Sequence, residues 1–318
     1  MQGIAENDHP IEITQSSRRV QIALALMAVY LFWGGTYLAM KVAIHSIPPF
    51  LMGGLRFFTA GTLVLLWECH KGAKLPTPRH WWSAAKIGLV LLVLSQGGLA
   101  WSEQFVPTGI AAIIFATVPL WMVLIGWLRQ KSPRPPAAVL VGLILGFCGI
   151  LLLVKNTVTN LGDNLLEWLG YAVVTLAAIT WAWGSLSSRD ASIPGSPFLA
   201  AAMQNLTGGA CYLLISLLSG EWSALSAGSF SIASVLSLLY LIVFGSLIGF
   251  GSYIWLLKVS DPTLVSTCAY VNPVVALFLG WVLGGETLAI SDIAATAIIL
   301  VSVIVITKCP SIPDELAK

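Results

Sequence analysis

Long apolar stretches dominate the chain, and only short polar segments separate them. A helix needs about 20 mostly apolar residues to cross the hydrocarbon core of a bilayer. On that scale the pattern predicts ten membrane-spanning helices, at residues 22–43, 48–67, 83–104, 109–128, 136–154, 166–187, 197–219, 233–257, 263–283 and 288–307. The expected fold class is an all-α polytopic membrane protein, with tails at residues 1–21 and 308–318.

The composition favours a membrane protein over a soluble one. Hydrophobic residues make up 57% of the chain and charged residues only 9%, with a mean hydropathy of +0.88. Soluble domains carry about 25% charged residues. This shortage of charge excludes a cytosolic enzyme, a nucleic-acid binder and a disordered chain, and it makes the lipid bilayer the expected surroundings. The five cysteines show no metal-binding spacing, so we expect neither a metal site nor a disulfide framework. The phosphate-binding motif GxxxxGK is also missing from the sequence, and we expect no cofactor.

Lys and Arg residues fall mainly on one side of the predicted spans. If the N-terminus is cytoplasmic, twelve of the sixteen lie inside, and only Lys41 and Lys155 lie outside. The other two, Arg56 and Lys86, lie within spans. Cytoplasmic loops of membrane proteins carry an excess of Lys and Arg. The sequence therefore predicts a multi-pass protein of a bacterial-type plasma (inner) membrane with both termini cytoplasmic.

The two halves of the chain repeat several short motifs in the same order. The matching pairs are Trp33-Gly34 with Trp183-Gly184, Pro49-Phe50-Leu51 with Pro197-Phe198-Leu199, Thr59 and Gly61 with Thr207 and Gly209, and Pro119 with Pro273. Five helices per repeat is an odd number, so the second repeat enters the membrane upside down. Carriers that alternate access around a site near the midplane use this inverted architecture. We expect two inverted five-helix repeats, residues 22–154 and 166–307, joined by a linker at 155–165.

Several motifs resemble a known transporter family. They are Phe32-Trp33-Gly34-Gly35-Thr36-Tyr37, Arg56-Phe57, Val106-Pro107-Thr108-Gly109, Asn272-Pro273 and Gly285-Glu286-Thr287-Leu288. With them, residues 22 to 307 resemble the EamA family of the drug/metabolite transporter superfamily, and especially its YedA-like branch. The first repeat departs from the pattern, because Gln130-Lys131-Ser132 stands where Glu286 has its counterpart.

That resemblance implies an exporter of small metabolites, such as amino acids or related compounds, with a central cavity between the repeats. It does not fix the substrate, the direction of transport or the choice between monomer and dimer. The alternative is a membrane-embedded enzyme acting on lipid or prenyl substrates. The inverted repeat and the lack of an HExxH or GxSxG motif favour a transporter that is not an enzyme.

Arg56 is the most informative charged residue, because it lies about 12 Å into the second span at 1.5 Å per residue. Intramembrane charges usually face a cavity or a partner. Arg56 could bind an anionic group of the substrate, pair with Glu103 at the outer end of the third span, or reach the outer interface. Glu103 is also the acid that proton coupling would use, although simple solvation at the interface explains it as well.

Other candidates for the cavity are polar or aromatic residues inside the spans. For the aromatic ones, packing in the core is the alternative explanation. Asn272-Pro273 and Thr117-Val118-Pro119 are expected to break helical hydrogen bonding at symmetric depths, a pattern associated with binding sites and also with simple kinks. Besides Arg56 and Glu103, the candidates are Trp33, Tyr37, Gln96, Trp101, Trp121, Trp183, Tyr253, Tyr270 and Asn272.

Overall fold

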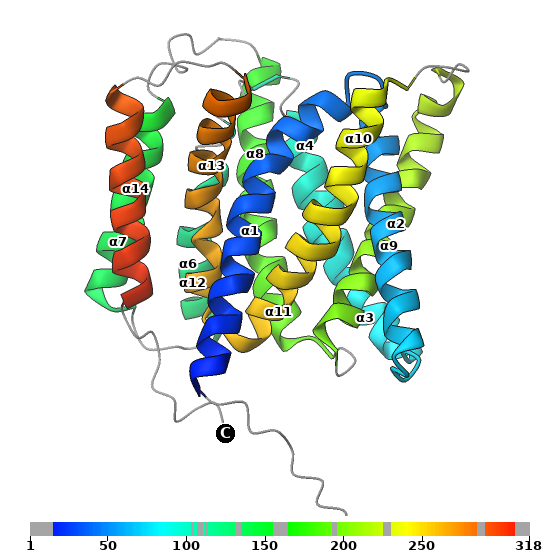
Figure 1. Cartoon of the computed structure of the whole chain (residues 1–318), viewed down its shortest axis with the longest axis horizontal. Helices are drawn as coiled ribbons and strands as arrows, with labels where there is room; N and C mark the ends of the chain where they lie inside the picture. The colour runs from blue at the N-terminus through cyan, green and yellow to red at the C-terminus, as the bar shows by residue number, and fades with distance from the viewer. Residues whose placement is uncertain are drawn as a thin grey trace, which may run out of the picture.

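The computed structural model describes residues 15–102, 105–106, 111, 114–130, 135–154, 165–192, 196–224, 230–284 and 290–308. Every regular element among these residues is a helix, and no strand occurs among them. Six of the described helices are long and apolar enough to cross a membrane, and three shorter apolar helices accompany them. Figure 1 shows them as steep rods side by side, the arrangement of a multi-pass membrane protein.

In the first half of the chain, helices alternate in direction between the lower and upper edges of the bundle (Figure 1). Its elements are α1 (Gln15–Ala43), α2 (Pro49–His70), α3 (Pro78–Gly88), η1 (Leu89–Gly97), α4 (Gly98–Ser102), α6 (Val118–Gln130) and α7 (Ala137–Val154). The consecutive elements α3, η1 and α4 form one rod over Pro78–Ser102. Its middle part, η1, is a π-helix, a rare geometry that often occurs at functional sites.

The second half contains a similar rod with a π-helical middle. Its elements are α8 (Leu165–Asp190), α9 (Pro197–Leu218), η2 (Glu221–Ala224), α10 (Ile232–Tyr240), η3 (Leu241–Phe250), α11 (Gly251–Val259), α12 (Pro262–Ser266), α13 (Cys268–Gly284) and α14 (Ile290–Lys308). The elements α10, η3 and α11 make one rod over Ile232–Val259, and η3 is its π-helix. Whereas α1 begins at the lower edge of the bundle, α8 begins at the upper edge (Figure 1).

The helix bounds agree with the expected spans to within a few residues in most places. The span expected at 197–219 is α9, Pro197–Leu218, and the span expected at 136–154 is α7, Ala137–Val154. Two helices start earlier than the apolar pattern predicts, because polar first turns extend them: α1 begins at Gln15 and α3 at Pro78. Part of the span expected at 109–128 lies outside the described residues.

The start of α2 is held by an acid from the second half of the chain. Pro49 is the first residue of α2, a position where proline costs no hydrogen bond. The carboxylate of Glu221 accepts the backbone N–H groups of Phe50, at 3.1 Å, and Leu51, at 2.8 Å. Ser216 also donates its hydroxyl to this carboxylate, at 2.7 Å. A negative charge at a helix N-terminus is favourable, so Glu221 fixes the upper end of α2 against α9 and η2.

Helix α2 packs along α9, the corresponding helix of the other half. A Cβ atom added at Gly61 would lie 2.7 Å from the backbone nitrogen of Leu206, and one added at Gly209 would lie 2.8 Å from Cα of Phe58. Glycine at both positions therefore lets the two backbones touch. Small residues at close helix crossings are common in membrane proteins.

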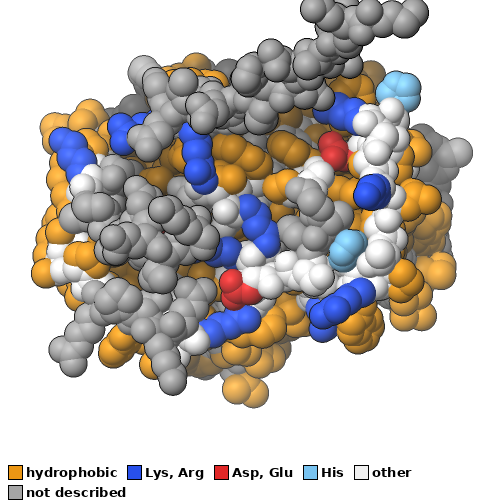
Figure 2. Space-filling view, turned by 90° about the horizontal axis from the view of Figure 1, so that it is seen from below, with side chains coloured by type: hydrophobic (Ala, Val, Ile, Leu, Met, Phe, Trp, Pro, Cys, Tyr) orange, Lys and Arg blue, Asp and Glu red, His pale blue; other side chains and the backbone are white. Residues whose placement is uncertain are grey.

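The lower face of the bundle, seen in Figure 2, is rich in Lys and Arg side chains among the described residues, with few acidic ones between them. Two hydrogen bonds join helix ends at this face. Arg18 at the start of α1 donates to the carbonyl of Val259 at the end of α11, at 3.4 Å. Lys258 of α11 donates to the carbonyl of Arg189 at the end of α8.

Candidate functional site

A cavity lies in the middle of the bundle, between helices of both halves. It contains about 890 Å³ of space that protein atoms do not fill, counting the part open to solvent. Pockets for small molecules are usually lined by apolar and aromatic side chains with a few polar groups among them. Its described walls come from α1, α2, η1, α4, the start of α6, α8, η3, α11, α12 and α13.

Arg56 of α2 reaches this cavity and is only 8% exposed. Its Nε donates to Oγ of Ser246 at 2.8 Å, and its Nη1 donates to Sδ of Met40 at 3.8 Å. The guanidinium carbon lies 4.8 Å from the centroid of the Phe57 ring, within the range of a cation–π contact. A Cβ at Gly245 would come within 2.8 Å of Nη2 of Arg56, so the absence of a side chain there makes room for the guanidinium.

Three aromatic rings form a second part of the cavity wall. Ring centroids are 5.7 Å apart for Trp33 and Trp181, 5.0 Å for Trp33 and Tyr253, and 5.4 Å for Trp181 and Tyr253. Trp181 donates Nε1–H to Oη of Tyr253 at 2.9 Å, and Ser185 shares a hydrogen bond with the same hydroxyl at 2.7 Å. Trp33 donates Nε1–H to the carbonyl of Gly245 at 2.9 Å. The polar atoms of the three rings are thus engaged within the protein, and the rings offer apolar surface to the cavity.

Both π-helical segments accept hydrogen bonds from the opposite half of the chain. In η3, the carbonyl of Gly245 accepts from Trp33 of α1. In η1, the carbonyl of Leu92 accepts from Oη of Tyr212 of α9 at 3.0 Å. Gly245 and Leu92 both line the cavity. The irregular middle of each rod is therefore tied across the boundary between the halves at the depth of the cavity.

The expected break in helical hydrogen bonding at Asn272-Pro273 lies inside helix α13, which continues through Pro273. A separate interruption of this span lies earlier, at Thr267 between α12 and α13. The hydroxyl of Thr267 donates to the carbonyl of Leu264 at 2.6 Å and satisfies the end of α12. Pro273 has no N–H, so the carbonyl of Ala269 lacks its usual helical donor. Ala269 lines the cavity beside Asn272, whose buried Oδ1 has no hydrogen-bond partner among the described residues.

The sequence-based candidates separate into three groups. Those that line the cavity are Trp33, Arg56, Gln96, Tyr253 and Asn272. Those that lie elsewhere are Trp101, Trp121, Trp183 and Tyr270. Glu103 and the side chain of Tyr37 lie outside the described residues, and so does the pairing of Arg56 with Glu103.

The residues away from the cavity have other contacts. Trp101 packs on Phe105 with centroids 4.9 Å apart. Trp121 donates to Oγ1 of Thr117 at 3.0 Å, and the fully buried Tyr270 donates to the carbonyl of Leu143 at 3.2 Å. Trp183 is 46% exposed.

Trp181 is the main cavity residue missing from the candidates chosen by sequence. It is 5% exposed and touches both Trp33 and Tyr253. Its sequence signal is the register of the repeat: Trp181 lies 148 residues after Trp33, the same separation as Pro197 from Pro49 and Gly209 from Gly61. Matching Trp33 with Trp183 uses a separation of 150 and selects a residue on another face of α8.

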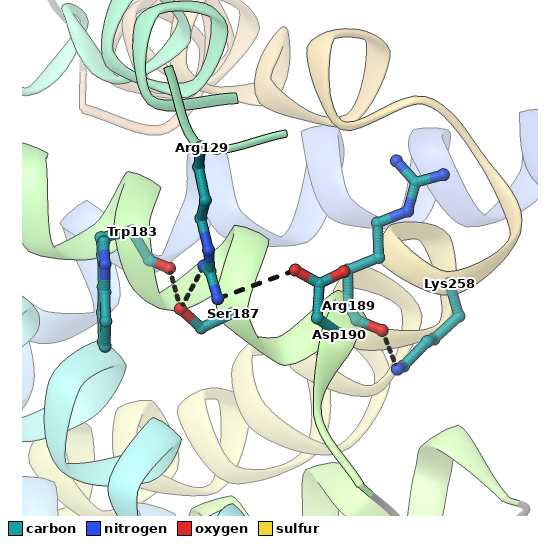
Figure 3. Close-up of polar contacts among 6 residues, drawn as sticks. All are labelled: Arg129, Trp183, Ser187, Arg189, Asp190 and Lys258. Atoms are coloured by element: carbon teal, nitrogen blue, oxygen red, sulfur yellow. Dashed lines mark hydrogen bonds and ion pairs between the residues drawn. The ribbon is translucent and has the colours of Figure 1, made fainter. Parts of the chain in front are cut away.

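Polar contacts join the helix ends on the lower face, as Figure 3 shows. Arg129 at the end of α6 donates to Oγ of Ser187 at 2.9 Å and lies 3.8 Å from the carboxylate of Asp190 on α8. Its guanidinium also lies 5.9 Å from the Trp183 ring. These contacts hold α6 and α8 together below the cavity.

Comparison with known proteins gives two matches to one family model. The EamA-like transporter family matches residues 21–155 and again residues 168–308. The inner membrane transporter YedA of Escherichia coli K12 is 37% identical over 285 residues, which cover 89% of each chain. A chloroplastic WAT1-related protein of Arabidopsis thaliana is 30% identical over 284 residues, covering 87% of this chain and 67% of that one.

A solved crystal structure shares the fold. Its TM-score is 0.76 at 21% identity, and the match covers 91% of this chain and 96% of the other. At this level of identity the likeness concerns the fold alone.

Proposed function

Because the chain belongs to the EamA-like transporter family, we propose that it is a secondary transporter that exports small metabolites, such as amino acids or related compounds, by alternating access. The main supporting observation is the cavity, whose walls come from both halves of the chain. In this mechanism, substrate binds between the halves, and movement of one half against the other exposes it to each side in turn.

The packing of the helices supports an inverted relationship between the halves. Helix α1 packs on the rod α10–η3–α11 of the second half, and α8 packs on the rod α3–η1–α4 of the first half, at η1 and α4. In the same way, α1 packs on α13, and α8 packs on α6. Exchange of the halves converts each contact into its counterpart, as a pseudo-two-fold axis requires. Because α1 begins at the lower edge of the bundle and α8 at the upper edge (Figure 1), the axis that fits lies in the membrane plane. We infer ten membrane helices, five in each repeat.

The charge of the lower face supports a cytoplasmic location for it. Lys and Arg predominate among its described residues (Figure 2), as they do on cytoplasmic faces of membrane proteins. The beginning of α1 and the end of α14 both lie at this face (Figure 1), so both termini would be cytoplasmic. In this orientation, the contacts of Arg129 with Ser187 and Asp190 belong to the inner gate.

Export can be tested by comparing the metabolites released by cells that contain or lack the protein. An untargeted panel of the medium should show at least one compound that leaves faster when the protein is present. Ala269→Trp fills the cavity and should abolish this difference, because Ala269 is part of the wall.

Ala297→Trp is the matched control, since Ala297 lies exposed on α14. It adds the same side chain outside the cavity and should leave release unchanged at equal protein abundance. The proposal would be contradicted if cells with and without the protein released every metabolite of the panel equally, whether the metabolite is more concentrated inside or outside the cells.

A further inference from the structure

The charge of the cavity wall restricts the charge of the ligand. Among the described residues that line the cavity, Arg56 is the one with a formal charge. No carboxylate of the described residues lies within ion-pair distance of its guanidinium. A buried cation without a counter-ion is costly in a low-dielectric region. A ligand with one negative charge would neutralise the cavity, whereas a cation would add to the repulsion.

The guanidinium of Arg56 is held in one orientation and still has donors to offer. Ser246 engages Nε, and the sulfur of Met40 is a weak acceptor for Nη1. The hydrogen bonds that Arg56 makes with described side chains use Nε and Nη1, which leaves Nη2 to donate to a ligand. Arginine binds carboxylates through two parallel N–H···O bonds, and an orientation fixed in advance lowers the entropy lost on binding. A carboxylate is therefore the anionic group that suits this position best.

The aromatic part of the wall restricts the rest of the ligand. The polar atoms of Trp33, Trp181 and Tyr253 already have hydrogen-bond partners within the protein. What these rings offer is apolar surface, which favours a flat apolar group through stacking or edge-to-face contact. Because Trp33 donates to the carbonyl of Gly245, and Arg56 lies directly against Gly245, the charged and aromatic regions adjoin at this residue.

Asn272 adds a hydrogen-bond acceptor without adding charge. Its Oδ1 is buried and has no partner among the described residues. Buried polar atoms of this kind usually find a partner, so a donor on the ligand would satisfy it. A neutral amide oxygen cannot neutralise an ammonium group. Asn272 therefore suits a hydroxyl or amide N–H better than a second ionic group.

Resting on the proposed function, and narrowing its substrates from amino acids to related compounds without an ammonium group, we propose that the cavity takes small monocarboxylates that have a net charge of −1, a flat apolar body and a neutral hydrogen-bond donor near the carboxylate. Arg56 binds the carboxylate, the rings of Trp33, Trp181 and Tyr253 contact the apolar body, and Asn272 accepts from the donor.

Calorimetric titration of the purified full-length protein in nanodiscs tests the charge preference with three probes of one shape: 3-phenylpropanoate, 3-phenylpropanamide and 3-phenylpropylamine. We expect the anion to bind at least tenfold more tightly than the amide, and the amine to bind most weakly. Phenylalanine, which adds an ammonium group, should bind more weakly than 3-phenylpropanoate. Equal affinity for the anion and the amide, or tighter binding of phenylalanine, would overturn the proposal.

Variants separate the residues. Arg56→Gln should remove the preference for the anion and leave the weak binding of the amide. Arg56→Lys should retain part of the preference for the anion. Ser246→Ala, which removes the acceptor that orients the guanidinium, should lower the affinity for the anion and leave the affinity for the amide unchanged. In the wild type, 2-hydroxy-3-phenylpropanoate should bind more tightly than 3-phenylpropanoate, because its hydroxyl can donate to Asn272. In Asn272→Leu the two probes should bind with equal affinity. A preference for the anion that persists in Arg56→Gln would contradict the assignment. The double variant Arg56→Gln with Glu103→Gln gives a further test. If it bound the anion as tightly as the wild type, Arg56 would be the partner of Glu103 and not of the ligand.

Transport of the same probes into proteoliposomes distinguishes this inference from the proposed function. Uptake of the amide or the amine at the rate of the anion would overturn the ligand class and leave a transporter. Binding of the anion that depends on Arg56, without any uptake, would support the ligand class and contradict transport.

Discussion

Trp33 and Trp181 meet edge to face in the centre of the bundle, with ring centroids 5.7 Å apart and planes at 72°. Each comes from the first helix of its half, α1 or α8, and the two are 148 residues apart in the chain. Their contact therefore lies at the boundary between the halves, and a movement of one half against the other would change it.

Trp181→Ala should lower transport per molecule at least tenfold, because it removes a ring that contacts Trp33 and Tyr253 in the cavity wall. Loss of a buried tryptophan costs about 3–5 kcal/mol, so Trp181→Phe is the milder variant that retains a ring. Proteoliposome uptake normalised to protein content measures the effect. The control is Trp183→Ala, two residues away and 46% exposed, which should change uptake less than twofold. A larger loss in Trp183→Ala than in Trp181→Ala would reverse our assignment.

Gly245→Ala should impair transport by displacing Arg56. The added Cβ would lie 2.8 Å from Nη2 of Arg56 and 3.1 Å from Cγ2 of Thr36. We expect a lower affinity for anionic substrates and a modest loss of thermal stability, measured by uptake and by thermal unfolding in detergent. Gly126→Ala on α6 is the control, since a Cβ there meets nothing within 4 Å and alanine favours a helix by roughly 0.5–1 kcal/mol. An unchanged affinity in Gly245→Ala would show that Arg56 does not depend on this space.

Gly209→Ala should destabilise the whole bundle by separating α2 from α9. The added methyl group would lie against the backbone of Phe57 and Phe58, which cannot move aside as a flexible side chain can. Membrane abundance and the temperature of aggregation, measured by fluorescence-detected size exclusion, should both fall. Gly98→Ala, with neighbours at 3.5 Å or more, should leave both near the wild-type values. Similar losses in the two variants would mean that the α2–α9 contact has no special role.

Arg129→Gln should open the lower side of the cavity while changing stability little. The ion pair between Arg129 and Asp190 is 3.8 Å long and its side chains are 39% and 47% exposed, and such exposed pairs contribute about 0–1 kcal/mol. Cys268 is 4% exposed in the cavity wall, so its thiol reports access. In a background without the other cysteines, a charged thiol reagent applied from the lower face should label Cys268 faster in Arg129→Gln. Cys268→Ser in the same background is the control and should show no labelling. Labelling of Cys268 that is slower in Arg129→Gln than without this substitution would contradict a role of Arg129 in closing the lower side.

Reporter fusions test the inverted arrangement directly. Fusions after Lys318 and within the linker at 155–165 should report opposite sides of the membrane, with the C-terminus cytoplasmic, because five spans separate the two points in our proposal. A phosphatase and a fluorescent protein at each site give reciprocal signals, which controls for expression. Signals from the same side would end the argument for inverted repeats.

The apolar pattern predicts the helices well because the thickness of the hydrocarbon core fixes the length of a helix that crosses the bilayer. Residues 197–219 and Pro197–Leu218 differ by one residue at one end. The π-helical middles of two rods could not be predicted, since η1 and η3 use the same apolar residues as the α-helical parts beside them. The capping of α2 by Glu221 depends on a contact between residues 170 apart, which no local pattern shows.

Part of the cavity followed from the sequence, because charge and polarity inside a span are rare and conspicuous. Arg56 and Asn272 stand out in this way, and both line the cavity. Aromatic residues do not stand out, because the same tryptophan serves a core, an interface or a cavity according to the face it occupies. Trp181 and Trp183 differ by about 200° around α8, so a two-residue error in the register of the repeat chooses the wrong side of the helix.

The contact between α2 and α9 is self-complementary. Gly61 lies against Leu206, and 148 residues further on their counterparts exchange roles, with Gly209 against Phe58. This is the isologous relationship that two identical subunits have in a symmetric dimer. Since Phe58 and Gly61 both lie on α2, a single half of this chain already contains both sides of the contact. Two copies of such a half, inserted in opposite directions, can associate as antiparallel partners, and fusing their genes adds only a linker.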